Sequence, residues 1–264
     1  MTRNIPLPKP EPGAKFKPGD FEEILRNIPS TCVLIGGQAV AWWAEKYTIT
    51  TPEGERVDAT SQDIDFWGKH EDLARIAKWL RSTPYIPNKR EMTLFVGAIP
   101  VVAAGKKTAL ELLRRVPGLD IQNPEAAAVP EAVSKDGKEL LILTPVSLVL
   151  SKLYNLRRFS QKDRHDLLHL QISLRAACVF ISEVVPRDAR FALWNCNRLI
   201  RAQREPRNQR LERRHGFQIL SGIPIDSLRA AVRRQSQPEE SREKLQRFLD
   251  DQWPRVSGRP TGEG

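Results

Sequence analysis

The sequence predicts an α+β fold, in which a mixed sheet is followed by a helical C-terminal region. Three observations lead to this prediction. The apolar run at residues 31–35 stops at Gly36 and Gly37 and turns directly into a helical pattern. Within residues 61–67, residues 63–66 alternate between polar and apolar side chains, as a half-buried strand does. From Thr144 onward the pattern is mostly helical.

The chain begins with residues 1–18, which contain five prolines and are expected to form an extended arm. Residues 19–143 form the expected core. Its expected helices are residues 21–27, 38–47 and 71–82. Its expected strands are residues 31–35, 61–67, a hairpin of 93–96 with 101–103, then 108–113 and 140–143. Connections are expected at residues 48–60 and 123–133, which are rich in polar residues, proline or alanine.

The second part opens with a strong helix start, because Thr144 can cap a helix that has Pro145 in its first turn. We expect that helix to end near residue 159 and to be followed by another at residues 163–177. Residues 144–234 form the expected helical region. Residues 235–264 form a charged tail, a helix followed by a Pro/Gly-rich end, and the tail is expected to be disordered.

Composition narrows the function classes. The net charge of +10 favours a polyanionic partner, although a general arginine bias would give the same charge. The three cysteines show no CxxC spacing and do not predict a disulfide framework. The longest apolar run, residues 140–150, is too short to span a bilayer, and the N-terminal residues contain no apolar signal core. We therefore expect a reducing, cytoplasmic location and no membrane partner.

Two local patterns point to phosphate and metal chemistry. Gly36 and Gly37 allow backbone N–H groups at a helix start to approach a bound anion. Asp63 and Asp65 stand at i and i+2 of a strand, so both carboxylates face the same side. Each pattern is common by itself, in tight turns and on solvated strand faces. Together they favour phosphoryl or nucleotidyl transfer.

The Gly-Gly turn followed by Ser-x-Asp-h-Asp-h, where h is apolar, resembles the nucleotidyltransferase superfamily, whose best-known member is DNA polymerase beta. The resemblance implies a polymerase-beta-like core and a third acid on a neighbouring strand. Glu111, between Leu110 and Leu112, fits that position; the alternative is an exposed glutamate on a helix. It also implies two Mg²⁺ ions held by Asp63, Asp65 and Glu111, and a nucleoside triphosphate (NTP) bound at Gly36, Gly37 and Gln38. Many members carry Ser or Thr where this chain has Gln38.

A second set of residues, in the helical part, consists of Thr144-Pro145, Lys152, Arg157, Lys162-Asp163 and Asp166-Leu167. This set resembles the AbiEii-like family, nucleotidyltransferase toxins of type IV toxin–antitoxin and abortive-infection systems, over residues 33–170. The resemblance implies that Lys152 approaches the triphosphate and that Asp163 or Asp166 is needed for activity. It also implies an RNA acceptor, in particular tRNA, and a cognate antitoxin protein. The alternative is that these charged residues form ion pairs between helices.

Two further patterns concern metal and RNA. His165 and His169 stand at i and i+4, but without another ligand nearby we expect a surface or packing role. Six arginines recur at every third residue and are candidates for RNA binding; a solvated helix face partly offset by Glu205 and Glu212 is the alternative. These arginines are Arg198, Arg201, Arg204, Arg207, Arg210 and Arg213.

The sequence thus predicts a Mg²⁺-dependent enzyme that transfers a nucleoside monophosphate from an NTP to an acceptor. The resemblance implies that the acceptor is RNA and that the enzyme acts as a toxin. Two rival functions stay open. One is an inactive nucleotidyltransferase fold that only binds RNA or protein. The other is a component of a defence or toxin pair whose activity appears only when its cognate protein is removed.

Overall fold

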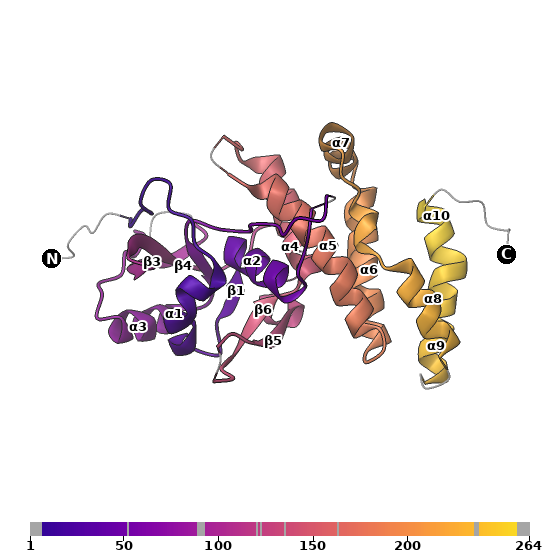
Figure 1. The fold of residues 1–264 in the computed structure, drawn as a ribbon, viewed down its shortest axis with the longest axis horizontal. Helices are drawn as coiled ribbons and strands as arrows, with labels where there is room; N and C mark the ends of the chain where they lie inside the picture. The colour runs from indigo at the N-terminus through magenta and orange to yellow at the C-terminus, as the bar shows by residue number, and fades with distance from the viewer. Residues whose placement is uncertain are drawn as a thin grey trace. The chain divides into compact units, whose positions relative to one another are not determined.

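The computed structural model describes residues 7–51, 53–88, 93–119, 121, 123–134, 136–162, 164–234 and 238–257. The chain divides into two compact units, Met1–His169 and Leu170–Gly264. The division falls after the residue 143 expected from the sequence, because α4 (Pro145–Arg158) packs with the sheet unit through α2 (Gly36–Lys46) (Figure 1). Each unit is described by itself.

The first unit is built on a six-stranded mixed sheet with the strand order β3-β4-β2-β1-β6-β5. β1 runs antiparallel to β2 and parallel to β6, and β2 runs parallel to β4. The α+β class with a mixed sheet is therefore confirmed. The strands are β1 (Val33–Ile35), β2 (Ile64–Trp67), β3 (Phe95–Ala103), β4 (Lys106–Leu113), β5 (Ala128–Ala132) and β6 (Glu139–Leu143).

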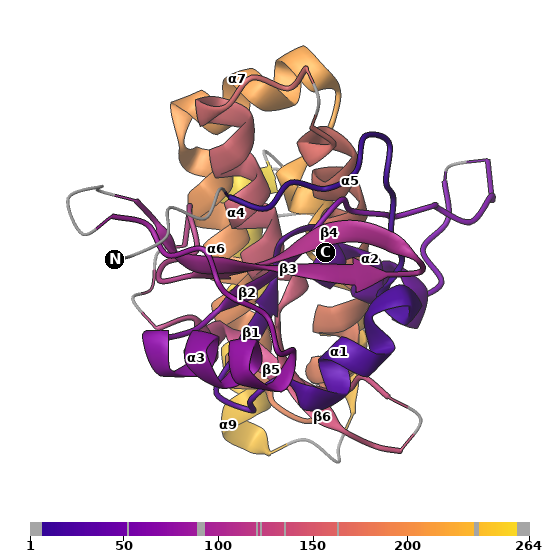
Figure 2. The same ribbon diagram turned by 90° about the vertical axis from the view of Figure 1, so that its left-hand side faces the viewer.

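The remaining helices of this unit are α1 (Glu22–Asn27), α3 (His70–Trp79) and the short 3₁₀ segments Pro18–Phe21 and Pro124–Ala127. Figure 2 shows β3 and β4 at the near edge of the sheet, with α1 and α3 below it. The predicted start of α4 is confirmed, because the hydroxyl of Thr144 accepts the N–H of Ser147 at 3.4 Å. The indole of Trp43 donates to the carbonyl of Leu143 at 2.9 Å and so ties α2 to the end of β6.

Two predictions about strands are wrong. Residues 93–96 and 101–103 do not form a hairpin, because Phe95–Ala103 is one continuous strand at the sheet edge. The N–H and carbonyl of Ala98 bond outward to Tyr85, so the nitrogen of Pro100, two residues on, also points outward and costs no bond to β4. Residues 128–132, expected as part of a connection, form the opposite edge strand β5, where Pro130 is likewise tolerated.

The N-terminal segment is part of the first unit over its described residues. Phe16 is fully buried and pairs with Ser61 in an isolated bridge, with N–O distances of 2.9 and 3.1 Å. Ala14 and Pro18 are buried too, so residues 14–18 of the expected arm lie against the core, and residues 1–6 lie outside the described part of the chain.

The second unit is helical, as predicted. It begins within α5 (Asp166–Val184), which starts three residues later than expected and continues past residue 177. Its other elements are α6 (Ala189–Arg204), α7 (Pro206–His215), the 3₁₀ turn Ile219–Gly222, α8 (Ile225–Arg233), α9 (Glu239–Arg247), a π-helical turn Phe248–Gln252 and α10 (Trp253–Ser257). Of the tail expected at residues 235–264, Glu239–Ser257 is helical, with Leu245 and Phe248 buried, so the disorder predicted for this part of the tail is wrong. Residues 258–264, the Pro/Gly-rich end, lie outside the described part.

Among the described residues, α5 alone is long and apolar enough to cross a membrane, by length and composition only. Half of the apolar window of α5 is buried inside the structure. A core helix of a folded domain passes the same test.

Candidate functional site

The glycine turn places the start of α2 directly against the acidic strand. Gly36 has a φ of +68°, and a Cβ at this position would lie 2.0 Å from Oδ2 of Asp65. A Cβ on Gly37 would lie 2.5 Å from Cβ of Ser61. Since a side chain on Gly36 would collide with Asp65 and one on Gly37 with Ser61, both glycines are required for this close approach. The approach brings the positive end of the α2 dipole to a carboxylate.

The strand that carries the two aspartates is braced before it begins. Asp63 directly precedes β2 and Asp65 lies within it, while Ile64 and Phe66 are fully buried. The hydroxyl of Ser61 donates to the carbonyl of Asp63. These contacts fix the backbone that presents both carboxylates.

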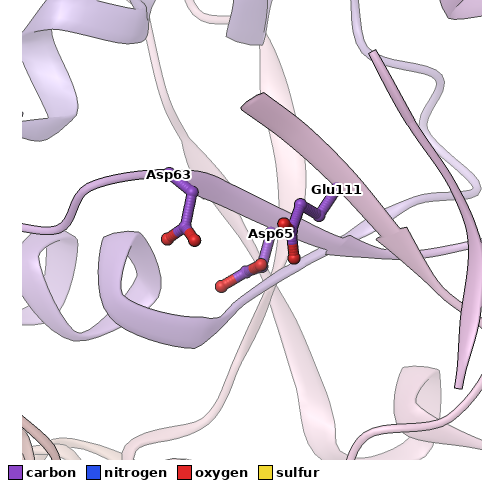
Figure 3. Close-up of side chains that lie close together, drawn as sticks. All are labelled: Asp63, Asp65 and Glu111. Carbon is purple, nitrogen blue, oxygen red and sulfur yellow. The ribbon is translucent and has the colours of Figure 1, made fainter. Parts of the chain in front are cut away.

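The third acid lies beside Asp65 on the neighbouring strand. β4 is parallel to β2, and Glu111 stands in register with Asp65. Leu110 and Leu112 are fully buried, so the side chain of Glu111 points to the opposite face, as its sequence context predicted. One oxygen from each of Asp63, Asp65 and Glu111 lies within 4.8 Å of the others, and Figure 3 shows the three carboxylates turned toward one another.

Burial and mutual repulsion make the charged forms of the three carboxyl groups unfavourable. Burial and the charge of Asp63 raise the pKa of Glu111 to about 7. Burial, with Asp63 and Glu111 next, raises the pKa of Asp65 well above its ordinary value. Burial also raises the pKa of Asp63, against the opposing effect of Lys152. A cation among these oxygens would relieve both the repulsion and the desolvation.

Lys152 forms the cationic side of the site. It is buried on α4, and its Nζ lies 3.1 Å from Oδ1 of Asp166. Asn155 donates to the same oxygen at 3.2 Å, and Arg164 donates to Oδ2 at 2.6 Å. Burial by itself would raise the pKa of Asp166, but Lys152, Arg164 and Asn155 hold it well below its ordinary value.

The expected ion pairing of Lys152 with Asp166 is therefore present, inside a site that Lys152 also lines. Because both oxygens of Asp166 accept hydrogen bonds from cations or an amide, Asp166 is suited to positioning Lys152 and poorly suited to accepting a proton. Asp163, the other predicted acid, lies outside the described residues.

The acids and Lys152 line one cavity of about 320 Å³, within the size range of small-molecule sites. Gly36 and Gly37 line it too. Its rim includes two exposed apolar side chains, Leu94 (40% exposed) and Phe159 (45% exposed). The guanidinium of Arg164 lies 5.1 Å from the centroid of the Phe159 ring. The cavity thus combines a charged floor with an apolar rim.

Sequence reasoning missed several of these residues. Asn155, Phe159 and Arg164 are separated from Asp63, Asp65 and Glu111 by many residues, and no local pattern connects them to these three acids. The polar spacing of Lys152 and Asn155 on one helix face was the one available signal.

The two histidines line the same cavity without forming a metal pair. The Nε2 atom of His169 lies 3.2 Å from the carbonyl of Thr60, and burial lowers the pKa of His169 to about 3. A neutral ring that donates to a backbone carbonyl has a packing role, as the sequence predicted. His165 is exposed at the rim.

Gln38 lies in α2, as expected, but its side chain points away from the cavity. Its side chain is buried, and Nε2 donates to the carbonyl of Phe16 at 3.0 Å and to the hydroxyl of Ser61 at 3.1 Å. It does not line the cavity within the described residues. Gln38 therefore supports the segment before β2, and the nucleotide-binding role predicted for it does not hold.

Not all six arginines predicted to bind RNA lie on the surface. Arg198 is 1% exposed, and its guanidinium lies 4.4 Å from the ring centroid of Trp194, so it cannot form part of an RNA-binding surface. Asn195, Arg198 and Ala202 form a buried stripe along α6, which only the packing of the folded unit reveals. The other five arginines of the series are exposed.

The chain matches no protein-family model, and comparisons with curated proteins and with solved structures gave no match either. The chemistry of the site is therefore inferred from the side chains and backbone groups that line it. The three carboxylates favour a divalent cation, and the helix start and Lys152 favour a bound anion.

Proposed function

We propose that this chain is a metal-dependent nucleotidyltransferase that transfers a nucleoside monophosphate from an NTP to an RNA acceptor. The observation that carries the proposal is the meeting of Asp63, Asp65 and Glu111 beside the Gly36–Gly37 turn, with Lys152 in the same cavity. The family-level resemblance of the sequence supports the same reaction.

The residues present fit Mg²⁺. All three candidate ligands are carboxylate oxygens, which Mg²⁺ prefers over nitrogen and sulfur. Burial, with repulsion from the neighbouring carboxylates next, raises the pKa values of Asp65 and Glu111, and a bound cation would favour their charged forms. Asp63, Asp65 and Glu111 would hold two ions, which when bound neutralise charge on the triphosphate and lower the pKa of the acceptor hydroxyl.

The chain's own residues would bind and orient the reactants. The N–H groups at the start of α2 and the ammonium of Lys152 would hold phosphate oxygens. Asp166 keeps Lys152 in place, because it accepts a hydrogen bond from its Nζ within a buried network. Phe159 and Leu94 offer an apolar rim for the flat face of a base.

In the reaction, an acceptor hydroxyl forms a bond to the α-phosphorus, and the bond from that phosphorus to the β-phosphate oxygen breaks. Pyrophosphate leaves, and the proton of the hydroxyl passes to solvent. Such a transfer depends mainly on positioning and on charge stabilisation. Toxicity, and neutralisation by a cognate protein, belong to the same proposal; growth arrest on expressing the chain alone, lost in Asp65→Asn, would support them.

The test is incubation with Mg²⁺, total cellular RNA and each NTP, labelled in turn at the α- and the γ-phosphate. We expect the α-label in RNA and no γ-label, which separates nucleotidyl transfer from phosphoryl transfer. Asp65→Asn should lower the transfer rate by roughly 10²–10³-fold, as loss of one stabilising group in an active site does. Asp226→Asn makes the same chemical change on a fully exposed carboxylate and should leave the rate unchanged.

Thermal denaturation of both variants would show that they fold. Wild-type activity in folded Asp65→Asn would contradict the proposal. RNA binding with no transfer from any NTP would instead favour the rival function, an inactive binding module.

A further inference from the structure

The second unit carries a dense group of exposed arginines along the end of α6 and α7. Residues 201–214 contain six arginines and two glutamates. The six are exposed, and we call them the α7 arginine surface: Arg201, Arg204, Arg207, Arg210, Arg213 and Arg214.

The helix geometry gathers half of this set into one line. A new helix begins at Pro206, so α7 runs from Pro206 to His215 (Figure 1). Within it Arg207, Arg210 and Arg214 stand at i, i+3 and i+7, which places them on one face. At a rise of 1.5 Å per residue, this line is about 10 Å long.

Elsewhere in the same unit, exposed arginines form ion pairs with acidic side chains, whereas those of the α7 arginine surface do not within the described residues. Arg187 pairs with Glu183 at 3.5 Å, Arg190 with Glu240 at 3.4 Å, and Arg229 with Asp226 at 3.7 Å. Within the described parts of the chain, no arginine of the α7 surface makes an ion pair.

One of the two local acids is turned away from the surface. The carboxylate of Glu212 accepts the N–H of Ile219 at 2.6 Å, and so serves the following turn. Like charges at helical spacing repel, so a stripe of this kind is unfavourable unless an anion neutralises it.

We propose that the α7 arginine surface binds the phosphodiester backbone of an RNA. Guanidinium groups bind phosphates through two hydrogen bonds, and a line of three can follow successive phosphates. A lipid surface fits less well, because a membrane-surface helix needs a large apolar face and α7 offers Leu211 alone. The choice of RNA over DNA rests on the proposed function.

The experiment measures binding of the full chain to a fluorescent structured RNA by anisotropy, from about 50 to about 200 mM salt. The test variant is Arg207→Gln/Arg210→Gln/Arg214→Gln. The control is Arg187→Gln/Arg190→Gln/Arg229→Gln, which removes the same charge from exposed, ion-paired arginines of the same unit. Circular dichroism and thermal melting confirm that both fold.

We expect the α7 variant to lose at least about tenfold in affinity and about two to three units of salt slope, since each phosphate contact contributes about 0.7–0.9. The control should lose less than about threefold, because its arginines contact no phosphate in this proposal. Equal losses in the two variants, or no loss in the α7 variant, would overturn the proposal.

Two further binding measurements, with DNA and with anionic lipid vesicles, separate RNA from the alternative ligands. A DNA duplex of the same length should bind more weakly than RNA, and vesicles of anionic lipid should not bind through these arginines. Tighter binding to DNA or to vesicles, lost in the α7 variant, would overturn the assignment to RNA. Asp65→Asn should bind RNA as the wild type does. RNA binding through α7 without any NMP transfer would therefore sustain this inference while the proposed function fails.

Discussion

Glu111→Gln should remove a pH-dependent loss of stability that Glu111 imposes on the metal-free protein. In the folded chain, burial and then the charge of Asp63 raise the pKa of Glu111 from 4.5 to about 7. A carboxyl group with a raised pKa binds its proton more tightly when folded than when unfolded. Its stabilising contribution is therefore complete below pH 4.5 and is lost as the pH rises to about 7.

The size of this effect follows from the shift itself. A change from 4.5 to about 7 corresponds to about 3 kcal/mol in the free energy of unfolding. The pKa values of Asp63 and Asp65 are also raised, so these two groups act in the same direction.

The assay is urea unfolding with EDTA at about pH 5 and about pH 8. Between these two pH values, the wild type should lose about 2.5 kcal/mol more than Glu111→Gln, because a small part of the effect is already present at about pH 5. Glu239→Gln, the same change at an exposed glutamate, should behave as the wild type does. Identical pH dependence in wild type and Glu111→Gln would refute the reasoning about the carboxylate cluster.

Mg²⁺ completes the same test, because a metal ion and protons compete for these oxygens. Mg²⁺ should stabilise the wild type more at about pH 8 than at about pH 5, and should stabilise Glu111→Gln little at either pH. Equal stabilisation at both pH values would mean that Mg²⁺ binds elsewhere.

Two further predictions concern the glycine turn and the buried ion pair. Gly36→Ala should abolish the Mg²⁺-induced rise in melting temperature, because its Cβ would lie 2.0 Å from the carboxylate of Asp65. Gly216→Ala, at a similar φ of +69° but in open space, should cost only about 1 kcal/mol of backbone strain and keep the Mg²⁺ response. Asp166→Asn should lower the free energy of unfolding in urea by about 3 kcal/mol, because it breaks a buried ion pair. This value is at the low end for such pairs, because the carboxylates of the metal site still lie near Lys152. Adding Lys152→Met should restore part of that loss, and a double variant as unstable as the sum of the two single ones would contradict the coupling.

Much of the fold could be predicted because its signals are local. The glycine turn, the alternation around Asp63 and Asp65, and the Thr144 cap are each set by a few consecutive residues. The facing of Glu111 could also be predicted, since an acid between two leucines on a strand must face away from them.

The errors share a different cause. Whether Pro100 interrupts a strand depends on whether that strand lies at a sheet edge, and strand order is a property of the whole sheet. Whether Gln38 or Arg198 reaches solvent depends on what packs over it. Neither the position of a strand in the sheet nor the burial of a side chain can be predicted from the neighbouring residues in the sequence.

The sequence by itself determined the chemical groups and their local facing: two glycines at a helix start, two aspartates on one side of a strand, and a run of arginines. Only the tertiary structure decided which of these groups meet. The parallel pairing of β2 with β4 brings Glu111 beside Asp65, and the packing of α4 brings Lys152 into the same cavity. Local pattern fixes the direction of a side chain relative to its own backbone, whereas distances between remote segments are set by strand pairing and by burial of the core.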